Sequence, residues 1–226
     1  MMEGTGMEKQ KYAAIVLAGC SGNRINSQVH KQYLIIQDRP VLYYSLKEFE
    51  DSAVDEIVLV VGKGEEEFCR REIVDKYGIS KVKAIVEGGK ERYHSVFEGL
   101  KQTSDADYVL IHDGARPYVS KQSINDLVEC LKTYDAGLLM VPCKDTIKEV
   151  KEGIVVKTLK RETLMQAQTP QVFKSEDIKV AYQKAKDEGY VATDDSQLFE
   201  RYIDKDIKAV LGDYSNLKIT TQEDLR

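Results

Sequence analysis

The chain has 226 residues, of which 42% are hydrophobic and 31% are charged, and its formal net charge is −5. This length suffices for one sizeable α/β domain with a full core, and a second independent domain is not expected. The acidic balance argues against general binding of nucleic acid. A site for anions therefore requires a local concentration of Lys and Arg.

The cysteines and the apolar runs exclude further classes. The four cysteines are scattered without any C-x-x-C and the three histidines are isolated, so neither a zinc site nor a disulfide framework is indicated. No apolar run approaches the ~20 residues of a membrane span, and residues 1–10 are polar. We expect a cytoplasmic protein that binds no membrane, with a flexible leader over residues 1–10 and a single domain over residues 11–226.

An apolar strand followed by a glycine loop opens the predicted domain. Ala13 to Leu17 are five apolar residues in a row, which is typical of a buried parallel strand. In the loop that follows, Gly19 and Gly22 permit close approach and positive φ, so backbone N–H groups can turn inward around an anion. Arg24 and Lys31 add positive charge at the far end of the loop. This combination is suited to a triphosphate.

The loop differs from two familiar nucleotide-binding motifs. The chain has no G-x-x-x-x-G-K-[ST], so the loop is not a P-loop, and Gly19 to Arg24 lacks the G-x-G-x-x-G spacing of a dinucleotide fingerprint. Two glycines after a strand also occur in a plain tight turn. The loop by itself leaves that alternative open.

The elements after the loop alternate between strands and helices. In chain order we expect a short strand over 33–36, a helix opened by Pro40, a strand over 56–61, a helix over 65–76, a strand over 82–86, a helix after Gly89, a strand over 108–111, a helix capped by Ser120 and a strand over 137–142. This order predicts a doubly wound, mostly parallel sheet. Ligands of such sheets bind at the carboxyl ends of the strands, where both glycine junctions would lie.

A charged junction follows the strand over 108–111, where the chain reads His112-Asp113-Gly114-Ala115-Arg116. A carboxylate at the tip of a central strand is suited to hold Mg²⁺ or a sugar hydroxyl, and Arg116 adds a fork for a phosphate. An ion pair between Asp113 and Arg116 that only ties down the turn is an alternative. His112 has no histidine or cysteine companion, so we expect it to pack against its neighbours.

The pattern changes at residues 144–165. Apolar and charged residues alternate on both sides of Lys151-Glu152-Gly153, as in a β-hairpin. An exposed two-stranded ribbon is marginal alone, so we expect this arm to pack on a second copy of the chain. Gln168 to Gln171 is expected to form a rigid polar turn, followed by a helix over 176–188, a helix capped by Thr193 to Asp195 and a strand over 207–211.

Several separated motifs agree with one enzyme family. Leu17 to Arg24 resembles the L-A-G-G-x-G-x-R signature of nucleotidyltransferases, and further blocks follow in order over almost the whole chain: Lys31-Gln32-Tyr33, Gly88-Gly89 with Glu91-Arg92 and Ser95, His112 to Pro117, Asp145 to Lys148, Arg161, Gln168 to Gln171, Thr193 to Asp195 and Asn216 to Asp224. Together they resemble the 2-C-methyl-D-erythritol 4-phosphate cytidylyltransferases.

The resemblance implies a fold and a reaction. The fold is a Rossmann-like nucleotidyltransferase sheet, mostly parallel and three-layered, with a protruding β-hairpin arm that pairs two subunits. The reaction is transfer of CMP from CTP to 2-C-methyl-D-erythritol 4-phosphate with release of pyrophosphate, in the non-mevalonate route to isoprenoids. Mg²⁺ or another divalent cation is the implied cofactor.

The resemblance also implies roles for particular residues. Arg24 and Lys31 would stabilise the α-phosphate in the transition state, while Arg161 and Lys218 would position the acceptor phosphate. The implied nucleotide-binding residues are Ala18, Gly19, Gly22, Gly89 and Ser95. The implied substrate-binding residues are Asp113, Arg116, Thr146 and Thr169, with Asp113 also a candidate metal ligand. Arg161, Thr146 and Thr169 lie on or beside the arm, and in this family they would reach into the neighbouring subunit's site.

One departure and two rival functions remain. Cys20 stands where the family usually has glycine. A ribitol 5-phosphate cytidylyltransferase would share the glycine loop, the Q-T-P-Q segment and the K-I-T-T ending, but Asp113 to Arg116 and Thr193 to Ser196 favour methylerythritol phosphate. A regulator that binds CTP without catalysis is the other rival, and the presence of all four catalytic cations argues against it.

Overall fold

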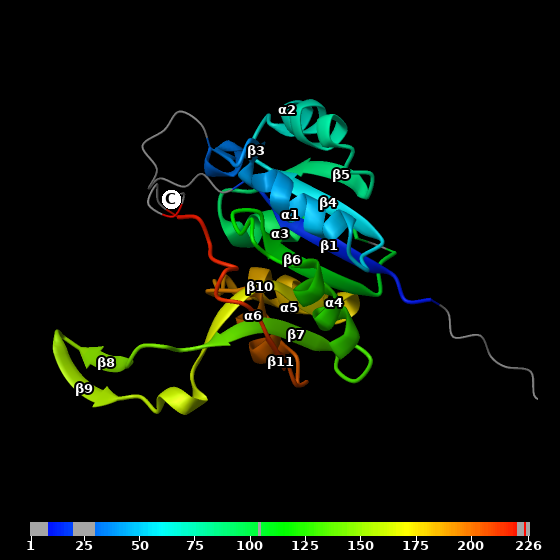
Figure 1. Cartoon of the computed structure of the whole chain (residues 1–226). Coiled ribbons are helices and arrows are strands. Elements are labelled where there is room, and N and C mark those ends of the chain that lie inside the picture. The colour runs from blue at the N-terminus through cyan, green and yellow to red at the C-terminus, as the bar shows by residue number, and fades with distance from the viewer. Residues whose placement is uncertain (1–8, 20–29, 104, 221–223, 225–226) are drawn as a thin grey trace, which may run out of the picture.

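The apolar runs form the strands of a seven-stranded sheet in the computed structural model, which describes residues 9–19, 30–103, 105–220 and 224. The strand order is β11-β7-β10-β6-β1-β4-β5 (Figure 1). Neighbouring strands are parallel except at β10, which runs antiparallel to both β6 and β7. The strands are β1 (Tyr12–Leu17), β4 (Glu56–Val61), β5 (Val82–Glu87), β6 (Tyr108–Asp113), β7 (Ala136–Pro142), β10 (Met165–Lys174) and β11 (Lys208–Leu211).

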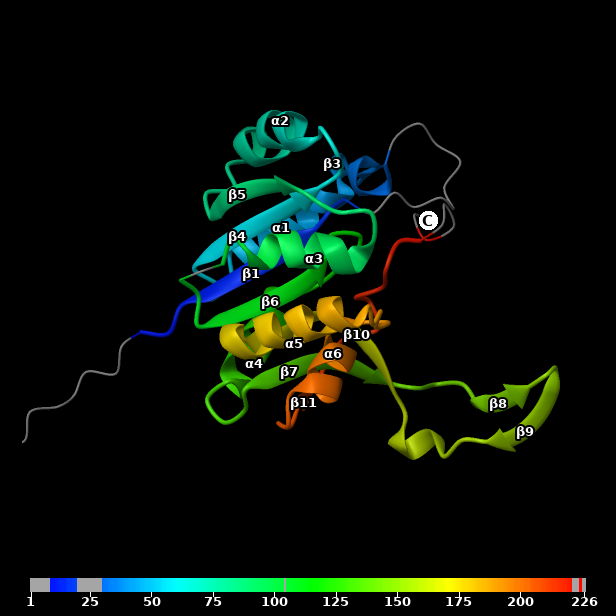
Figure 2. The same cartoon turned by 180° about the vertical axis from the view of Figure 1, so that it is seen from behind.

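Helices cover both faces of the sheet and make three layers (Figures 1 and 2). One face is covered by α1 (Val41–Glu50), by α2 (Glu66–Cys69) with the π-helical segment Arg70–Asp75, and by α4 (Lys121–Cys130). The other is covered by α3 (Arg92–Leu100), α5 (Ser175–Glu188) and α6 (Asp195–Tyr202). Because β1 has a strand on each side and helices on both faces, it has no polar face, which explains its unbroken apolar run.

The predicted helix caps are confirmed. The Ser120 side chain accepts a hydrogen bond from the Ser123 N–H at the start of α4, and the Asp194 side chain accepts one from the Gln197 N–H at the start of α6. Each satisfies a backbone donor that the first helical turn leaves open. No helix in the described part of the chain is long and apolar enough to cross a membrane.

Two predicted segments differ from the structure. In place of a strand over 33–36, the chain forms a 3₁₀ turn, η1 (Lys31–Tyr33), and then the two-residue strand β2 (Ile35–Ile36), paired with β3 (Arg39–Pro40). The polar turn predicted for Gln168 to Gln171 is wrong, because these residues belong to β10. The register shifts between Ala167 and Gln171, and this irregularity accommodates a proline inside a paired strand.

The arm is a separate hairpin, as the sequence predicts. β8 (Lys148–Lys151) pairs antiparallel with β9 (Ile154–Thr158) across Glu152 and Gly153, whose φ angles are +49° and +80°. A 3₁₀ turn, η3 (Arg161–Thr163), leads back to the sheet. Both figures of the whole chain show the arm projecting away from the layered body. Every residue of β8 and β9 is exposed.

Candidate active site

The carboxyl ends of β1, β4 and β5 enclose a cavity of about 840 Å³. It contains Gly19, Gly89 and Ser95, three of the predicted nucleotide-binding residues, and Ala18 directly precedes Gly19 in the chain. The complete lining is Gly19, His30, Val61, Gly62, Lys63, Glu87, Gly88, Gly89, Lys90, Glu91, Arg92 and Ser95. The two glycine junctions that the sequence predicts to meet therefore share one cavity.

Close approach explains the glycine at position 19. A Cβ there would lie 2.8 Å from the carbonyl oxygen of Val61, which is backbone and cannot move aside like a side chain. Gly19 uses the close approach that glycine permits and not the positive φ, since its φ lies outside the left-handed region. The Gly88 N–H donates to the same Val61 oxygen at 2.8 Å. Both loops thus pack on the end of β4 without side chains between them.

Glu65 fixes the turn η1, which begins at Lys31 directly after the cavity-lining residue His30. Its carboxylate accepts hydrogen bonds from the Tyr33 hydroxyl at 2.6 Å and from the Gly62 N–H at 3.0 Å. Its other oxygen lies 2.7 Å from His30 Nδ1. These contacts hold η1 against the end of β4, and sequence analysis missed them because a glutamate in a charged segment carries no distinguishing signal. Gly22, Arg24 and Cys20 lie outside the described residues, so their predicted roles stay predictions.

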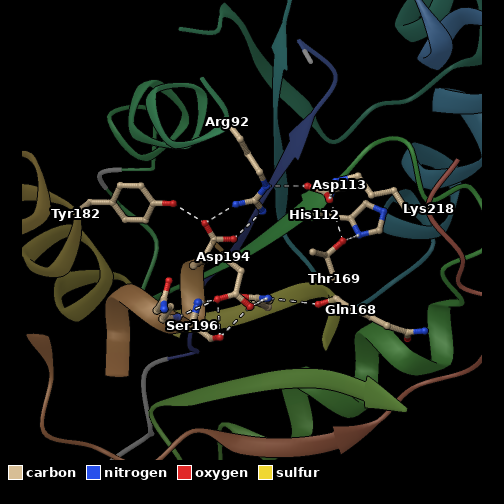
Figure 3. Close-up of polar contacts among 12 residues, drawn as sticks. Arg92, His112, Asp113, Gln168, Thr169, Tyr182, Asp194, Ser196 and Lys218 are labelled. Carbon is tan, nitrogen blue, oxygen red and sulfur yellow. Dashed lines mark hydrogen bonds and ion pairs between the residues drawn. The ribbon is translucent and has the colours of Figure 1, made fainter. Parts of the chain in front are cut away.

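A second charged group lies at the tip of β6. Asp113 Oδ1 accepts a hydrogen bond from Arg92 Nε at 3.0 Å and Oδ2 accepts one from Lys218 Nζ at 2.6 Å (Figure 3). Burial alone would raise the pKa of Asp113, but the two cations outweigh burial and hold that pKa far below its usual range. The alternative ion pair between Asp113 and Arg116 is not what the structure shows, since Arg116 Nη1 donates to the Asn216 carbonyl at 2.7 Å.

Arg92 is itself anchored on the side away from Asp113. Its Nη1 and Nη2 atoms donate to the two carboxylate oxygens of Asp195 at 2.9 and 2.8 Å. The Tyr182 hydroxyl donates to Asp195 as well. Arg92 and Asp195 each fall in a motif of the family resemblance, but sequence analysis assigned neither a role. Their partnership is visible only once α3 and α6 lie on the same face of the sheet.

The chain segment after β11 brings Lys218 to this site. The Asn216 side chain donates to the Thr169 carbonyl at 2.9 Å, and the Ile219 N–H donates to the Ala115 carbonyl at 2.8 Å. Lys218 lies between these two anchors. Arg116 lies close by as a mostly buried cation whose Nε has no hydrogen-bond partner among the described residues. Burial lowers the pKa of Arg116, although Asp113 opposes this, so an added anion would stabilise its charge.

Thr169 is part of this site and not of the arm. It is 5% exposed within β10, and its Oγ1 accepts a hydrogen bond from the Asp113 N–H at 3.1 Å. The prediction that Thr169 reaches into a neighbouring subunit is therefore wrong for its position in the fold. Thr146 and Arg161, in contrast, lie exposed on the arm, where Arg161 Nη1 donates to the Lys144 carbonyl at 3.0 Å. The structure does not bring these two residues to the cavity of their own chain.

The residues at this site fit a protein-bound divalent cation poorly. Both oxygens of Asp113 already face cations, so a metal ion would have to displace Lys218 or Arg92. The described residues also contain no group of three or more His, Cys, Asp or Glu side chains able to hold a metal. The metal contact predicted for Asp113 stays a prediction, and the geometry favours its other predicted role, a contact to substrate.

A three-layered, mostly parallel sheet with a glycine-lined cavity beside a cationic site defines an α/β nucleotidyltransferase. The family model of 2-C-methyl-D-erythritol 4-phosphate cytidylyltransferase, IspD, matches residues 12–226. The chain belongs to this family.

Individual relatives agree with this membership. A 2-C-methyl-D-erythritol 4-phosphate cytidylyltransferase of Alkaliphilus metalliredigens is 45% identical over 218 residues, which are 95% of this chain and 90% of the relative. A 4-diphosphocytidyl-2C-methyl-D-erythritol synthase of Anaerococcus prevotii superposes with a TM-score of 0.85 at 35% identity, covering 96% of this chain and 93% of that one. The enzyme of Francisella tularensis gives 0.79 at 30% identity, covering 96% and 97%.

His112 predicts how stability depends on pH. It is completely buried, packs on Phe49 as expected, and burial lowers its pKa from 6.5 to about 3. The unfolded chain therefore binds a proton near pH 6.5 that the folded chain does not, so the free energy of unfolding falls as the pH drops from 6.5 towards 3. We expect a loss of about 2 kcal/mol between about pH 6.5 and pH 5, at ~1.4 kcal/mol per pH unit.

Urea denaturation across this pH range checks the expectation. In His112→Gln most of the pH dependence should disappear, whatever stability the substitution itself costs. His30 and His94 are present in both proteins, so the comparison isolates the effect of His112. If the free energy of unfolding changes equally with pH in the two proteins, His112 is not the source of the pH dependence.

Proposed function

We propose that this chain transfers CMP from CTP to 2-C-methyl-D-erythritol 4-phosphate at the two neighbouring groups described above. CTP occupies the glycine-lined cavity, and the acceptor binds at Asp113, Arg116 and Lys218. This assignment rests on one observation: Arg92 lines the cavity and also contacts Asp113. One side chain thus touches both proposed substrate sites, so the two reactants would meet side by side.

The chemistry needs positioned cations more than a covalent intermediate. An oxygen of the acceptor phosphate attacks the α-phosphorus of CTP in line, and pyrophosphate leaves. Two polyanions must approach each other, and charge moves onto the bridging oxygen. Lys31 and Arg24 are assigned the role of stabilising that charge, because donors that bind more strongly in the transition state lower the barrier. The anchoring of η1 by Glu65 and Tyr33 supports this role for Lys31.

The acceptor side is assigned from its charges. Lys218 and Arg116 are the cations that a phosphate would contact, and the Nε of Arg116, which lacks a partner among the described residues, supports this. Asp113 would accept a hydrogen bond from an acceptor hydroxyl. Thr169 contributes by holding the backbone of Asp113 through its hydroxyl oxygen. These groups distinguish a polyol phosphate from a simple phosphate because they offer a carboxylate as well as cations.

A divalent cation, Mg²⁺ by preference, is proposed to accompany CTP. Such an ion screens the charge of the triphosphate when bound. No ligand is assigned to it from the protein, because the carboxylate of Asp113 is already shared between two cations.

We further assign the arm to a homodimer. Val150, Ile154, Val155 and Val156 are 52% to 70% exposed on it, and a second copy would cover them. Arg161 and Thr146 would then act in the partner's acceptor site, which agrees with their distance from their own cavity in the fold. A cytoplasmic location is proposed from the cysteines, since Cys69, Cys130 and Cys143 are free thiols.

Pyrophosphate release from CTP tests the reaction. We expect turnover with 2-C-methyl-D-erythritol 4-phosphate and a kcat/KM at least about tenfold lower with ribitol 5-phosphate, because Asp113 to Arg116 and Thr193 to Ser196 match the methylerythritol phosphate family. A preference for ribitol 5-phosphate would overturn the choice of acceptor. Tight CTP binding without pyrophosphate release from any acceptor would instead favour the non-catalytic regulator.

Mixed dimers test the role of the arm. We expect Arg161→Ala and Lys218→Ala each to be nearly inactive, whereas heterodimers of the two contain one site with both residues intact. Random pairing makes half of all dimers mixed, so activity should recover to about a quarter of the wild-type value. The measurement is pyrophosphate release after the two variants are co-refolded.

The control is a mixture of Lys31→Ala with Lys218→Ala. Both residues are assigned to their own chain's site, so neither site of their heterodimer would be intact and no recovery is expected. If the mixture of Arg161→Ala with Lys218→Ala regains no activity, Arg161 does not act in the partner's site. This conclusion holds whether or not the control mixture regains activity.

A further inference from the structure

All the nitrogen atoms of the Arg92 guanidinium are engaged. Nε donates to Asp113, and Nη1 and Nη2 both donate to Asp195. A planar guanidinium held by two parallel hydrogen bonds cannot rotate without breaking both. The fork on Asp195 therefore fixes the direction in which Nε points, which is towards Asp113.

Asp195 is held firmly enough to serve as the anchor. Its side chain is 0% exposed, it begins α6, and the Tyr182 hydroxyl from α5 donates to it. The start of α6 is fastened to β10 as well, because the Ser196 N–H donates to Gln171 at 2.8 Å and the Gln171 amide donates to Asp194 at 3.0 Å. Figure 3 shows these contacts of Tyr182, Asp194 and Ser196. The anchor thus rests on three elements of the core.

Lys218 holds the same carboxylate in a different way. It lies in a segment without regular secondary structure, its side chain is 36% exposed, and its ammonium contacts Asp113 with one hydrogen bond. An ammonium is a point charge with three donors on a flexible stem, so it can change partner by rotation. Of the two cations that contact Asp113, Lys218 can therefore exchange Asp113 for another hydrogen-bond partner, whereas Arg92 cannot.

The charges of the group explain why this difference matters. Asp195, Arg92, Asp113 and Lys218 alternate in sign, so the four balance before an acceptor binds. An acceptor phosphate would compete with Asp113 for Lys218. Asp113 would then face a second anion, and repulsion would push its side chain away unless another cation kept it in place.

We propose that Arg92 is a positioning residue, locked by Asp195 and Tyr182, which keeps Asp113 directed at the acceptor hydroxyls while Lys218 exchanges Asp113 for the acceptor phosphate. This inference rests on the proposed function and adds to it a division of roles between the two cations. Lys218 serves as the exchangeable partner, and Arg92 as the fixed one. Asp195 acts on the reaction only through Arg92 and Asp113.

Asp195→Asn tests the lock with minimal change of shape. The amide cannot accept both guanidinium N–H groups, so Arg92 loses its fixed orientation. We expect the KM for 2-C-methyl-D-erythritol 4-phosphate to rise at least about tenfold, and the CTP dissociation constant to stay within about threefold. Asp187→Asn is the matched control: it is the same substitution at an exposed residue of α5, where the carboxylate accepts a hydrogen bond from Gln183 at 2.8 Å and takes no part in the anchor, so the acceptor KM should not change.

A double-mutant cycle separates positioning from a general loss of structure. If Asp195 acts through Asp113, then Asp113→Asn with Asp195→Asn should lose no more than about threefold in kcat/KM beyond Asp113→Asn alone. If the two substitutions instead reduce kcat/KM by independent factors that multiply in the double mutant, the inference is overturned. An unchanged acceptor KM in Asp195→Asn would overturn it too.

Two further points keep the test decisive. If circular dichroism shows that Asp195→Asn does not fold, Arg92→Lys enters the same cycle, because a lysine keeps the charge but cannot span Asp113 and Asp195 together.

The wild-type protein is assayed first with CTP and 2-C-methyl-D-erythritol 4-phosphate. Absence of turnover there refutes the proposed function, whereas an active wild type with multiplying losses refutes only the role of Arg92.

Discussion

One carboxylate held between two cations is the interaction on which the site depends. Asp113 stands at the end of β6, the middle strand of the sheet, and its two oxygens face Arg92 and Lys218. The residues around it come from α3, from β10 and from the segment after β11. The parallel register of β6 with β1 places this group beside the glycine-lined cavity, because Leu17 pairs with Asp113 at the ends of the two strands.

Such a group contributes little to stability. Burying a charge costs several kcal/mol, and a buried ion pair returns this only with good geometry, although removing one partner costs roughly 3–5 kcal/mol. The arrangement is therefore better explained by what it allows. A polyol phosphate brings both hydroxyls and a dianion, and the group offers an acceptor for the former and exchangeable positive charge for the latter. Burial disfavours the charged form of Arg116, so a bound anion would stabilise that charge, which is a further reason for an anion to bind here.

Local pattern predicted most of the fold and only part of the site. The strand Glu56–Val61 was predicted with the same limits that the structure has, because a strand buried on both faces must be apolar throughout. The glycine junctions were predicted to meet for a topological reason and they do. Gln168 to Gln171 was mistaken for a turn because proline normally ends a strand, and the sheet accommodates it through a shift in register. Thr169 was placed on or beside the arm with the roles that the family resemblance implies, whereas the structure has it buried in β10.

The ion pairs could not be predicted from spacing. Arg92 and Asp195 are 103 residues apart and Asp113 and Lys218 are 105 apart, so no local pattern links them. Family motifs indicated Asp113 and Lys218 as substrate contacts, whereas the partnership of Arg92 with Asp195 needed the packing of α3 and α6 on one face. The resemblance thus named the residues proposed to contact substrate, and the structure added Arg92 and Asp195, which hold Asp113 in place.

The most direct measurement is a crystal structure of the enzyme with a non-hydrolysable CTP analogue and 2-C-methyl-D-erythritol 4-phosphate. The account predicts that Arg92 Nε stays within about 3 Å of Asp113, that Lys218 Nζ moves to the acceptor phosphate, and that an acceptor hydroxyl takes its place on the carboxylate. A complex in which Lys218 still holds Asp113 and the acceptor phosphate binds elsewhere would contradict it.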